Sequence, residues 1–477
     1  MKKRTFLKTV ATASSLALLP SSIFALKGSK NRLRTAHIGV GNMGFEDLKA
    51  IASHNLVDVV ALCDVDSSYL KTAKQIHPKA KTFSDYREML NSIGDAIDAV
   101  IVSTPDHTHA PASLMAMEMG KSVYCQKPLT HHVSEARAMR KLAEEKNLVT
   151  QMGIQVHSFY DYKLATVLIQ SGIIGKVHTV RAWSPKNWGY NGAAPKGSDT
   201  VPEALDWNLW LGTAKMRTYK EGYYHPGNWR KLLDYGCGTL GDMGVHIFDT
   251  PYNALELDVP FTIKNECREP TTYGYPESNT VTYEFPGTKY TSDTLKWVWY
   301  DGPGAPEKHD ELELPDSEKS KEGPTSEVAE QSMEDKMSLD VKEAETGKLP
   351  EQGAMFIGDE GRLLLPHFMQ LPKKIVKGNY VDISREIEEV GKEHGLGEPI
   401  RNYETEGPKH YHQFINACLG KGSCTAPFSY AARLTETILL GVIAGRFPNK
   451  TLHWDNEKAR FSEEEANQYL SSIYREF

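Results

Sequence analysis

The fold of this chain is decided by the stretch Thr35-Ala-His-Ile-Gly39-Val-Gly41-Asn-Met-Gly44. A short apolar strand runs into three glycines with the spacing G-x-G-x-x-G. Gly39 allows the tight turn, Gly41 lets the backbone approach a pyrophosphate, and Gly44 lets the next helix pack closely on the strand. Free N–H groups at the start of that helix favour the same pyrophosphate. The stretch therefore predicts a dinucleotide-binding turn.

The residues after this turn supply the context that an isolated glycine motif lacks. Residues 45–54 have the length of a helix, and residues 57–63 form a second apolar strand that ends in Asp64. A carboxylate at that place accepts hydrogen bonds from the adenosine ribose hydroxyls and repels a 2′-phosphate. The unit therefore favours NAD over NADP.

The composition is that of an ordinary globular protein, with 40% hydrophobic and 25% charged residues. At 477 residues the chain is too long for one core, so two domains with insertions are expected. A net charge of -7 gives no basic footprint for nucleic acid. No apolar run approaches the roughly 20 residues that a membrane span needs.

The six cysteines show no Cys-x-x-Cys spacing, which argues against a zinc knuckle or a redox pair. Cys418 and Cys424 are close enough in sequence for a disulfide, and free thiols fit equally well.

Residues 1–30 predict an export signal and linker. A basic head at 2–4 precedes a short apolar stretch at 10–19, as in a secretory signal. The run 3–8 is similar to the twin-arginine motif with lysine in the first place, which leaves general secretion open. We expect a periplasmic or otherwise exported protein, and a frayed cytoplasmic N-terminus is the alternative.

Helices and strands alternate from residue 31 to residue 152 and predict a Rossmann domain with a doubly wound parallel sheet. Strands are expected at 96–103, 122–125 and 148–152, and helices at 67–76, 110–119 and 134–146. Ligands of such sheets lie beyond the carboxyl ends of the strands. Besides the three glycines and Asp64, the expected cofactor contacts are Asn42, Met43, Ser103, Thr104, Pro105, His107, His109, Gln126 and Lys127.

A second domain is expected over 153–460, for substrate binding and oligomerisation. Two-residue alternation at 177–183, 280–285, 290–299 and 354–365 indicates an α+β domain with an open, mainly antiparallel sheet. Residues 301–351 are rich in Glu, Lys, Ser and Pro and predict a solvated acidic insertion. Helices at 410–419 and 431–443 and a polar tail at 461–477 complete the chain.

Lys127 is the first candidate catalytic residue. It follows a strand at the carboxyl edge of the sheet, where it can reach the nicotinamide end of a dinucleotide. An ammonium there can also stabilise a developing alkoxide on a substrate. A Lys-Pro pair taken alone is more often only a strand end.

Asp242 and His246 are the second pair of candidates. They are four residues apart, so on a helix they share one face. Histidine can take an alcohol proton near neutral pH, and a carboxylate one turn away can orient the ring and favour its protonated form. A helix-start aspartate plus a core histidine explains the spacing as well. No third ligand has metal spacing, so no metal site is expected.

An aromatic and polar cluster supplies the candidate substrate contacts. Such side chains stack on sugar rings and bind hydroxyls, although they can equally serve packing. The candidates are His157, Trp188, Tyr223, Tyr224, Asn228, Trp229 and Arg230.

Several separate motifs, in order, resemble the Gfo/Idh/MocA oxidoreductases over about residues 33 to 460. They are Gly39-Val-Gly-Asn-Met-Gly44, Ser103-Thr-Pro-Asp-His-Thr-His109, Gln126-Lys-Pro128 and Gly241-Asp-Met-Gly-Val-His246. The blocks Leu205-Asp-Trp-Asn-Leu-Trp-Leu-Gly212 and His225-Pro-Gly-Asn-Trp-Arg230 resemble a secreted branch that acts on carbohydrates.

The resemblance implies Lys127 as the lysine of a Glu-Lys-Pro motif, and Asp242 and His246 as an Asp-x-x-x-His pair. Gln126 replaces the usual glutamate, so a partner that could tune Lys127 is neutral here. The role of the lysine is therefore open. The family also implies a homo-oligomer, tightly bound NAD and a small sugar or glycoside as substrate.

Three functions follow from these observations. The first is an NAD(H)-dependent oxidoreductase that interconverts a secondary hydroxyl and a ketone, at carbon 3 by the family resemblance. The second is a redox-neutral glycosidase with bound NAD, which needs a further base such as His157, Tyr223 or Tyr224. The third is a nucleotide-binding or sugar-sensing protein, against which Lys127, Asp242 and His246 together argue. The sugar, its anomer, the direction and the export route stay open.

Overall fold

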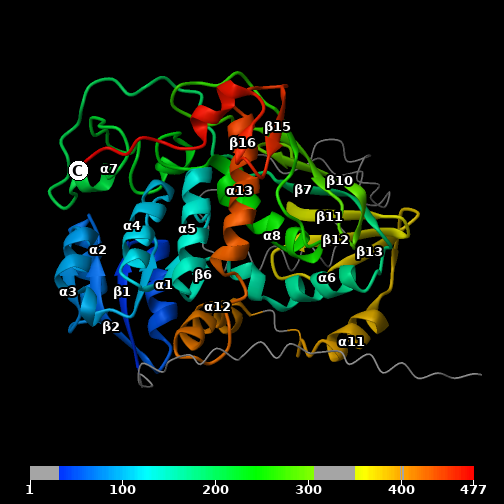
Figure 1. The fold of residues 1–477 in the computed structure, drawn as a ribbon, viewed down its shortest axis with the longest axis horizontal. Coiled ribbons are helices and arrows are strands. Elements are labelled where there is room, and N and C mark those ends of the chain that lie inside the picture. The colour runs from blue at the N-terminus through cyan, green and yellow to red at the C-terminus, as the bar shows by residue number, and fades with distance from the viewer. Residues whose placement is uncertain (1–31, 306–349, 398, 400–401) are drawn as a thin grey trace, which may run out of the picture.

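The computed structural model describes residues 32–305, 350–397, 399 and 402–477. The predicted export signal and almost all of the predicted acidic insertion lie outside those residues. Two sheets organise the described chain, one in each half of Figure 1.

The first sheet has six strands in the order β3-β2-β1-β4-β5-β6, and every neighbouring pair is parallel. The order reverses between β1 and β4, which creates a crevice at the carboxyl ends of the strands. The predicted doubly wound Rossmann sheet is thus confirmed. Its strands are β1 (Leu33–Ile38), β2 (Val57–Cys63), β3 (Lys81–Phe83), β4 (Ala99–Val102), β5 (Ser122–Cys125) and β6 (Thr150–Met152).

Five helices connect these strands: α1 (Met43–Ala52), α2 (Ser67–Ile76), α3 (Tyr86–Ile93), α4 (Asp106–Glu118) and α5 (Val133–Lys146). Three of them, α1, α4 and α5, begin one to four residues earlier than the sequence predicts. Helix α4 starts at Asp106 rather than residue 110, because Pro105 stands directly before its first turn, where a fixed φ suits helix entry. Asp106, His107 and His109 are therefore helical residues at the crevice.

The second sheet has ten strands in the order β14-β13-β12-β11-β7-β10-β9-β8-β15-β16. Its pairs are antiparallel except for β7 with β10, so the predicted open, mainly antiparallel sheet is confirmed. The strands are β7 (Val177–Ser184), β8 (Thr262–Glu266), β9 (Asn279–Pro286), β10 (Thr291–Asp301), β11 (Gln352–Gly358), β12 (Gly361–His367), β13 (Lys373–Val376), β14 (Asn379–Val381), β15 (Thr451–Asp455) and β16 (Arg460–Phe461).

The alternating segment 354–365 is a hairpin and not one strand. Strands β11 and β12 pair antiparallel from Gln352 with His367 to Gly358 with Gly361. The turn needs Gly361, whose φ of +135° is open to glycine alone. Two-residue alternation continues through both strands, so periodicity did not reveal the turn. The hairpin places His367, the last residue of β12, on the side of the second sheet that faces the Rossmann domain.

Late helices join the two halves. Helix α12 (Tyr403–Cys418) packs on α1, and α13 (Phe428–Ala444) packs on α5. In Figure 1, α13 runs between the two halves, and α12 lies at the lower edge of the first half. Helix α13 also packs on α8 (Val245–Ala254), which packs on α6 (Tyr160–Gln170). Helices that we predicted in the second domain thus share a hydrophobic core with the Rossmann domain.

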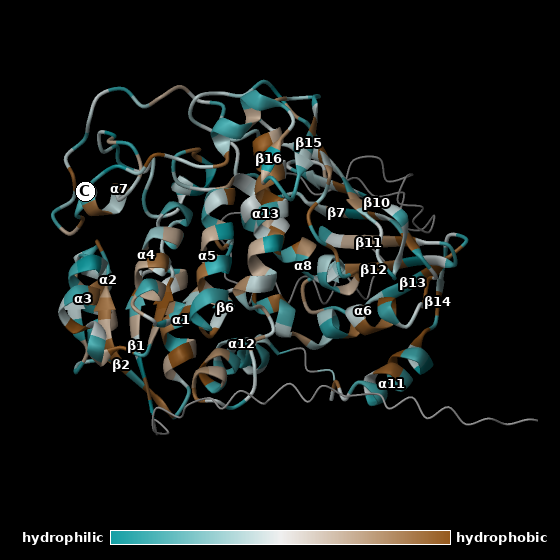
Figure 2. Cartoon of the chain, viewed as in Figure 1, coloured by the Kyte–Doolittle hydropathy of each residue, from teal (hydrophilic) through white to brown (hydrophobic). Residues whose placement is uncertain are grey.

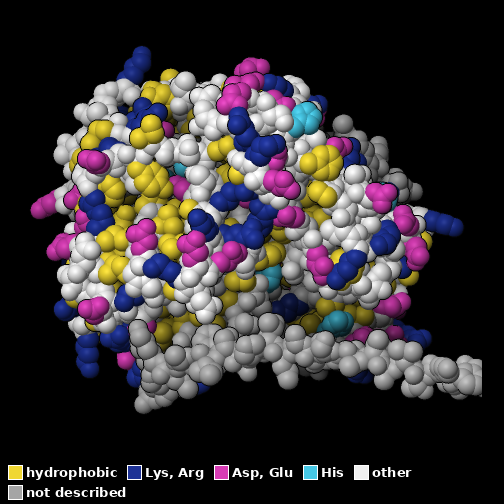
Figure 3. Space-filling model, in the orientation of Figure 1, with side chains coloured by type: hydrophobic (Ala, Val, Ile, Leu, Met, Phe, Trp, Pro, Cys, Tyr) yellow, Lys and Arg dark blue, Asp and Glu magenta, His cyan; other side chains and the backbone are white. Residues whose placement is uncertain are grey.

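The surface and core follow the composition. Figure 2 shows hydrophobic residues along the strands of both sheets, and the face in Figure 3 mixes lysine and arginine with aspartate and glutamate. Within the described ranges, no helix is both long and apolar enough to cross a membrane. All six cysteines are free thiols, including Cys418 and Cys424.

Candidate active site

A pocket of about 490 Å³ lies where the two halves meet, a size typical of small-molecule sites. Its lining combines the turn after β1, the carboxyl ends of β2, β4 and β5, and loops of the second half. Twelve of the thirteen predicted cofactor contacts line it: Gly39, Gly41, Asn42, Met43, Gly44, Asp64, Ser103, Thr104, Pro105, His109, Gln126 and Lys127.

The glycine turn forms one end of the pocket, and its close contacts show why side chains are absent there. Gly39 has a φ of +82°, and a Cβ on it would lie 2.5 Å from the carbonyl oxygen of Ser103. A Cβ on Gly44 would lie 2.3 Å from the carbonyl oxygen of Gly39. This bare backbone leads directly into α1, whose N-terminus suits a pyrophosphate.

Asp64 stands at the pocket's edge, at the end of β2. Its carboxylate accepts backbone N–H groups from Val40 at 2.8 Å and Asp66 at 2.9 Å. Burial raises the pKa of Asp64 to about 6, against the lowering effect of these hydrogen bonds. The glycine turn and this fixed acceptor fit the adenosine and pyrophosphate parts of NAD.

Asp47 on α1 explains the glutamine at position 126. The Nε2 of Gln126 lies 2.9 Å from both carboxylate oxygens of Asp47. Ser103 Oγ and the Tyr411 hydroxyl also donate to Asp47, at 2.6 and 2.7 Å. Burial raises the pKa of Asp47 to about 6, and these donors oppose the rise. Sequence reasoning missed Asp47, because the resemblance directs attention to the motif and not to a helix 79 residues away.

His109 on α4 connects the ends of two strands. Its ring nitrogens lie 2.8 Å from the carbonyl oxygens of Thr104 and Pro128. Burial lowers the pKa of His109 to about 4, and the carbonyl oxygens of Pro128 and Thr104 oppose the change. This residue therefore holds the segment after β4 against the segment that carries Lys127.

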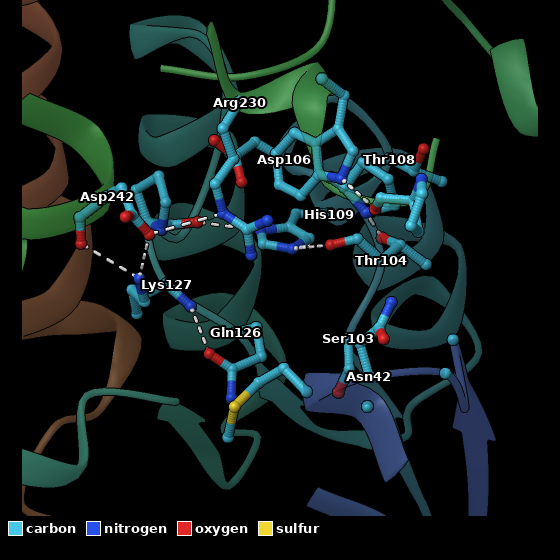
Figure 4. Close-up of a pocket in the computed structure, with 18 of the residues that line it drawn as sticks. Asn42, Ser103, Thr104, Asp106, Thr108, His109, Gln126, Lys127, Arg230 and Asp242 are labelled. Carbon is cyan, nitrogen blue, oxygen red and sulfur yellow. Dashed lines mark hydrogen bonds and ion pairs between the residues drawn. The ribbon is translucent and has the colours of Figure 1, made fainter. Parts of the chain in front are cut away.

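Lys127 and Asp242 meet at the other end of the pocket. Lys127 Nζ donates to Asp242 Oδ1 at 2.8 Å and to the Asp242 carbonyl at 3.0 Å. Trp188 Nε1 donates to Asp242 Oδ2 at 2.6 Å, and Lys186 Nζ lies 3.2 Å from that oxygen. Figure 4 shows Lys127 and Arg230 both directed toward Asp242, with Arg230 Nε at 3.5 Å.

This cluster shifts the ionisation of its members. Burial raises the pKa of Asp242, but Lys127, Lys186 and Arg230 outweigh burial and hold that pKa well below its ordinary value. Burial lowers the pKa of Lys127, and Asp242 opposes the change. Asp242 is therefore a carboxylate that anchors Lys127 in the pocket.

His246 lines the same end of the pocket without a bond to Asp242. Asp242 lies in a π turn, Leu240–Gly244, that leads into α8, and its carboxylate is taken by Lys127 and Trp188. His246 Nδ1 is buried and has no hydrogen-bond partner among the described residues. Asp242 therefore holds Lys127, not the imidazole as the spacing suggested.

The ionisation of His246 also differs from the prediction. Burial, Lys127 and His367 together lower the pKa of His246 well below its ordinary value, and the opposing effect of Asp242 is smaller. The ring is thus neutral near pH 7, which is the form that accepts a proton.

Several predicted residues lie away from the pocket lining. His157 Nδ1 pairs with Asp249 at 2.9 Å, and His107 Nε2 lies 3.2 Å from the Trp210 carbonyl. Tyr223 and Tyr224 pack in an aromatic cluster with Trp210 and Tyr235, and Asn228 Nδ2 donates to the Gly222 carbonyl at 2.6 Å. Of the predicted substrate contacts, Trp229 and Arg230 line the pocket, and Trp188 acts through Asp242.

Asp106, Lys186 and His367 are three of the lining residues that were absent from the predicted set. Asp106 is buried in the first turn of α4, where burial raises its pKa to about 7 against the effect of Arg230 and Lys127. It lies inside the predicted 103–109 segment and could have been singled out as the acid of a helix start. Lys186 after β7 and His367 at the end of β12 carry no such signal, because only the sheet places them here.

The C-terminal segment reaches the adenosine end. Figure 1 shows it, in red, crossing toward α7 (Trp207–Leu211) and the first sheet's half. Phe477 lines the pocket, and the Arg87 guanidinium carbon lies 3.8 Å from its ring centre. Arg475 Nε donates to the Ala214 carbonyl at 3.0 Å, which ties the segment down.

In the part of the chain that the structure describes, no three His, Cys, Asp or Glu side chains are grouped so that they could hold a metal ion.

Comparison with known proteins agrees with this geometry. A model described as oxidoreductase family, NAD-binding Rossmann fold, matches residues 33–154. A second, oxidoreductase family, C-terminal alpha/beta domain, matches residues 161–284. The chain belongs to the Gfo/Idh/MocA oxidoreductase family. Members of this family carry an NAD-binding Rossmann domain. In this chain the glycine turn and Asp64 of that domain line the pocket.

Curated relatives match part of the chain. An alpha-N-acetylgalactosaminidase of Shewanella oneidensis is 32% identical over 180 residues, which is 35% of this chain and 39% of the relative. A glycosyl hydrolase family 109 protein of Stenotrophomonas maltophilia is 36% identical over 137 residues, 26% of this chain and 29% of that protein. The chain thus matches about two fifths of such a relative at most.

Solved structures of this Gfo/Idh/MocA fold cover nearly all of the chain. Levoglucosan dehydrogenase in complex with NADH aligns with a TM-score of 0.58 and 16% identity, over 88% of this chain and 98% of that one. Aldose-aldose oxidoreductase from Caulobacter crescentus, complexed with glycerol, aligns with a TM-score of 0.54 and 13% identity, over 88% and 99%. At these identities the likeness establishes the fold.

Proposed function

We propose that this protein is an NAD(H)-dependent oxidoreductase that interconverts a secondary hydroxyl and a ketone, at carbon 3, of a sugar or glycoside. One observation carries the proposal: a neutral histidine, His246, and an anchored ammonium, Lys127, line the same pocket as the dinucleotide turn. The family and the sugar-acting proteins of this fold support the substrate class.

The residues that would hold NAD are those of the glycine turn, Asp64 and the ends of β4 and β5. When bound, NAD supplies an acceptor for the hydrogen of the hydroxyl-bearing carbon and returns it in the reverse direction. Phe477 and Arg87 close the adenosine end and support a tightly held cofactor.

The chain's own residues handle the proton and the oxygen. His246, neutral at pH 7, takes the hydroxyl proton as general base and returns it on reduction. Lys127 donates to the same oxygen and stabilises negative charge that develops there. Asp242 keeps Lys127 in place through its 2.8 Å bond.

A redox-neutral glycosidase is the second candidate. The alpha-N-acetylgalactosaminidase of Shewanella oneidensis favours it, at 32% identity over part of the chain. Elimination needs a second base, and the candidates named from the sequence, His157, Tyr223 and Tyr224, do not line the pocket. Asp106 and His367 do line it and are better placed for this proton.

The deciding experiment uses protein purified without added cofactor. We would record absorbance at the reduced-nicotinamide band, add a panel of glycosides and analyse the sugar products. A lasting spectral change with a keto-glycoside supports the oxidoreductase. Released aglycone without net change of the nicotinamide supports the glycosidase. The absence of both responses would contradict both proposed activities.

We also propose export to the periplasm, from the basic and apolar pattern of residues 1–30, and a homo-oligomer, from the family resemblance. Cell fractionation tests the first, and light scattering of the purified protein tests the second.

A further inference from the structure

The end of the pocket opposite the glycine turn carries more positive than negative charge. Lys127, Lys186 and Arg230 line it, and all three lie within 3.5 Å of one carboxylate, that of Asp242. One carboxylate carries one negative charge, and the shortest of its three ion pairs is the one with Lys127, at 2.8 Å. Lys186 and Arg230 are therefore in excess.

The other ionisable groups near this end do not cancel that excess. His246 and His367 are neutral near pH 7, because burial lowers the pKa of each ring. Asp106 is half ionised near pH 7. Asp64 and the paired Asp85 and Arg87 lie at the adenosine end. A positive charge of at least one remains.

The two extra cations also face open space. The side chains of Lys186 and Arg230 are 40% and 30% exposed, against 15% for Lys127. The Arg230 guanidinium lies over the Trp229 ring at 4.4 Å, which holds its plane. Its terminal nitrogens make no hydrogen bond to other residues in the described ranges. A held, unoccupied guanidinium fork matches a planar or tetrahedral oxyanion.

We propose that the substrate of this pocket is a sugar or glycoside that carries an anionic group, a carboxylate or a sulfate ester, bound by Lys186 and Arg230. This inference rests on the proposed function and names its substrate class. A neutral sugar would leave the surplus positive charge of this partly enclosed pocket unbalanced, which is unfavourable.

Calorimetric titration of the cofactor-containing protein as purified tests the proposal. The probes are methyl β-D-glucoside, the matching glucuronide and the matching 6-sulfate, in low and high salt. We expect at least one anion to bind about tenfold more tightly than the neutral glycoside, since charge-assisted hydrogen bonds are stronger than neutral ones. The advantage should shrink in high salt. The glucuronide and the sulfate distinguish the two anion sources.

Variants test the residues. Lys186→Met and Arg230→Gln should each weaken binding of the anion much more than binding of the neutral glycoside, so that most of the preference for the anion is lost. Lys231→Met is the matched control, because Lys231 faces the Tyr190 ring outside the pocket lining. Unchanged nicotinamide content would show that each variant is folded.

The outcomes separate this inference from the proposed function. Equal or weaker binding of both anions, or equal loss of neutral and anionic binding in Lys186→Met, overturns the anionic substrate class. Turnover of neutral glycosides without a gain from either anion leaves the proposed function and removes the inference. Tight anion binding without nicotinamide chemistry keeps the inference and removes the function.

Discussion

The two ends of the pocket are built in different ways. The adenosine end comes mainly from one continuous unit, the glycine turn, α1 and β2, which ends at Asp64. The opposite end, which we call the reacting end after the proposed function, gathers Lys127, Lys186, Arg230, Asp242 and His367 from five separate places in the chain. A local motif can specify the first end, whereas the second exists only once the two sheets are assembled. Four predictions follow from this difference, from the largest expected effect to the smallest.

His246→Asn should break the reacting end alone. Loss of the general base is expected to lower kcat by about 10²- to 10⁴-fold, with nucleotide content unchanged. Steady-state kinetics with the best glycoside and absorbance of the extracted cofactor measure the two quantities. His178→Asn, an exposed histidine on β7, is the control. Undiminished turnover would refute the role of His246.

Gly39→Ala should break the adenosine end alone. The new Cβ would meet the Ser103 carbonyl at 2.5 Å at a φ of +82°, a strain of about 1–2 kcal/mol before the clash is counted. We expect more than tenfold weaker NAD binding, measured by titration of nucleotide-free protein. Gly172→Ala also has a positive φ, +81°, but nothing lies within 4 Å of its Cβ, so it separates strain from clash.

Gln126→Glu tests the contact between the two ends. A second carboxylate would face Asp47 where an amide now donates, which should lower the free energy of unfolding by about 3 kcal/mol near pH 7. Adding Asp47→Asn restores an amide–carboxylate pair with the roles exchanged and should recover most of the loss. Urea unfolding of the two single variants and the double variant measures the coupling; additive losses would contradict it.

Asp106 should make the affinity for anions depend on pH. Its pKa is about 7, so raising the pH from 6 to 8 turns a neutral acid into a carboxylate near Arg230, Lys127, Asp242 and Cys237. The added negative charge should weaken binding of the glucuronide by about fivefold, while the neutral glycoside is unaffected. Asp106→Asn should remove the dependence. An opposite slope, or a slope that persists in the variant, would contradict the assignment.

The first half shows how far residues alone can go. The strand β2, the helix α2 and the strand β5 begin and end as expected, and the glycine turn lines the pocket. These elements depend on local periodicity and on glycines that no other residue can replace. The start of helix α4 and the turn between β11 and β12 were harder to predict. The hydrophobic period shows neither the helix start after Pro105 nor a turn inside a run that keeps alternating.

The reacting end shows the limit. Asp242 and His246 were found from their spacing, but the spacing could not tell that Asp242 pairs with Lys127, which lies 115 residues away. Nor could it show that His246 is neutral, since that follows from burial and from nearby Lys127 and His367. Only some of the aromatic and polar candidates lie at the pocket. Trp229 and Arg230 line it, whereas Tyr223 and Tyr224 pack in an aromatic cluster.

The sequence by itself determined the Rossmann sheet and the dinucleotide turn, and it picked out Lys127, Asp242 and His246 as candidates, because each of these signals depends on neighbours within a few residues. Only the tertiary structure decided which of these groups touch, which are charged, and that Lys186, Asp106 and Asp47 join them. Charge and protonation in a pocket depend on burial and on distances between groups far apart in the chain, and folding alone sets those distances.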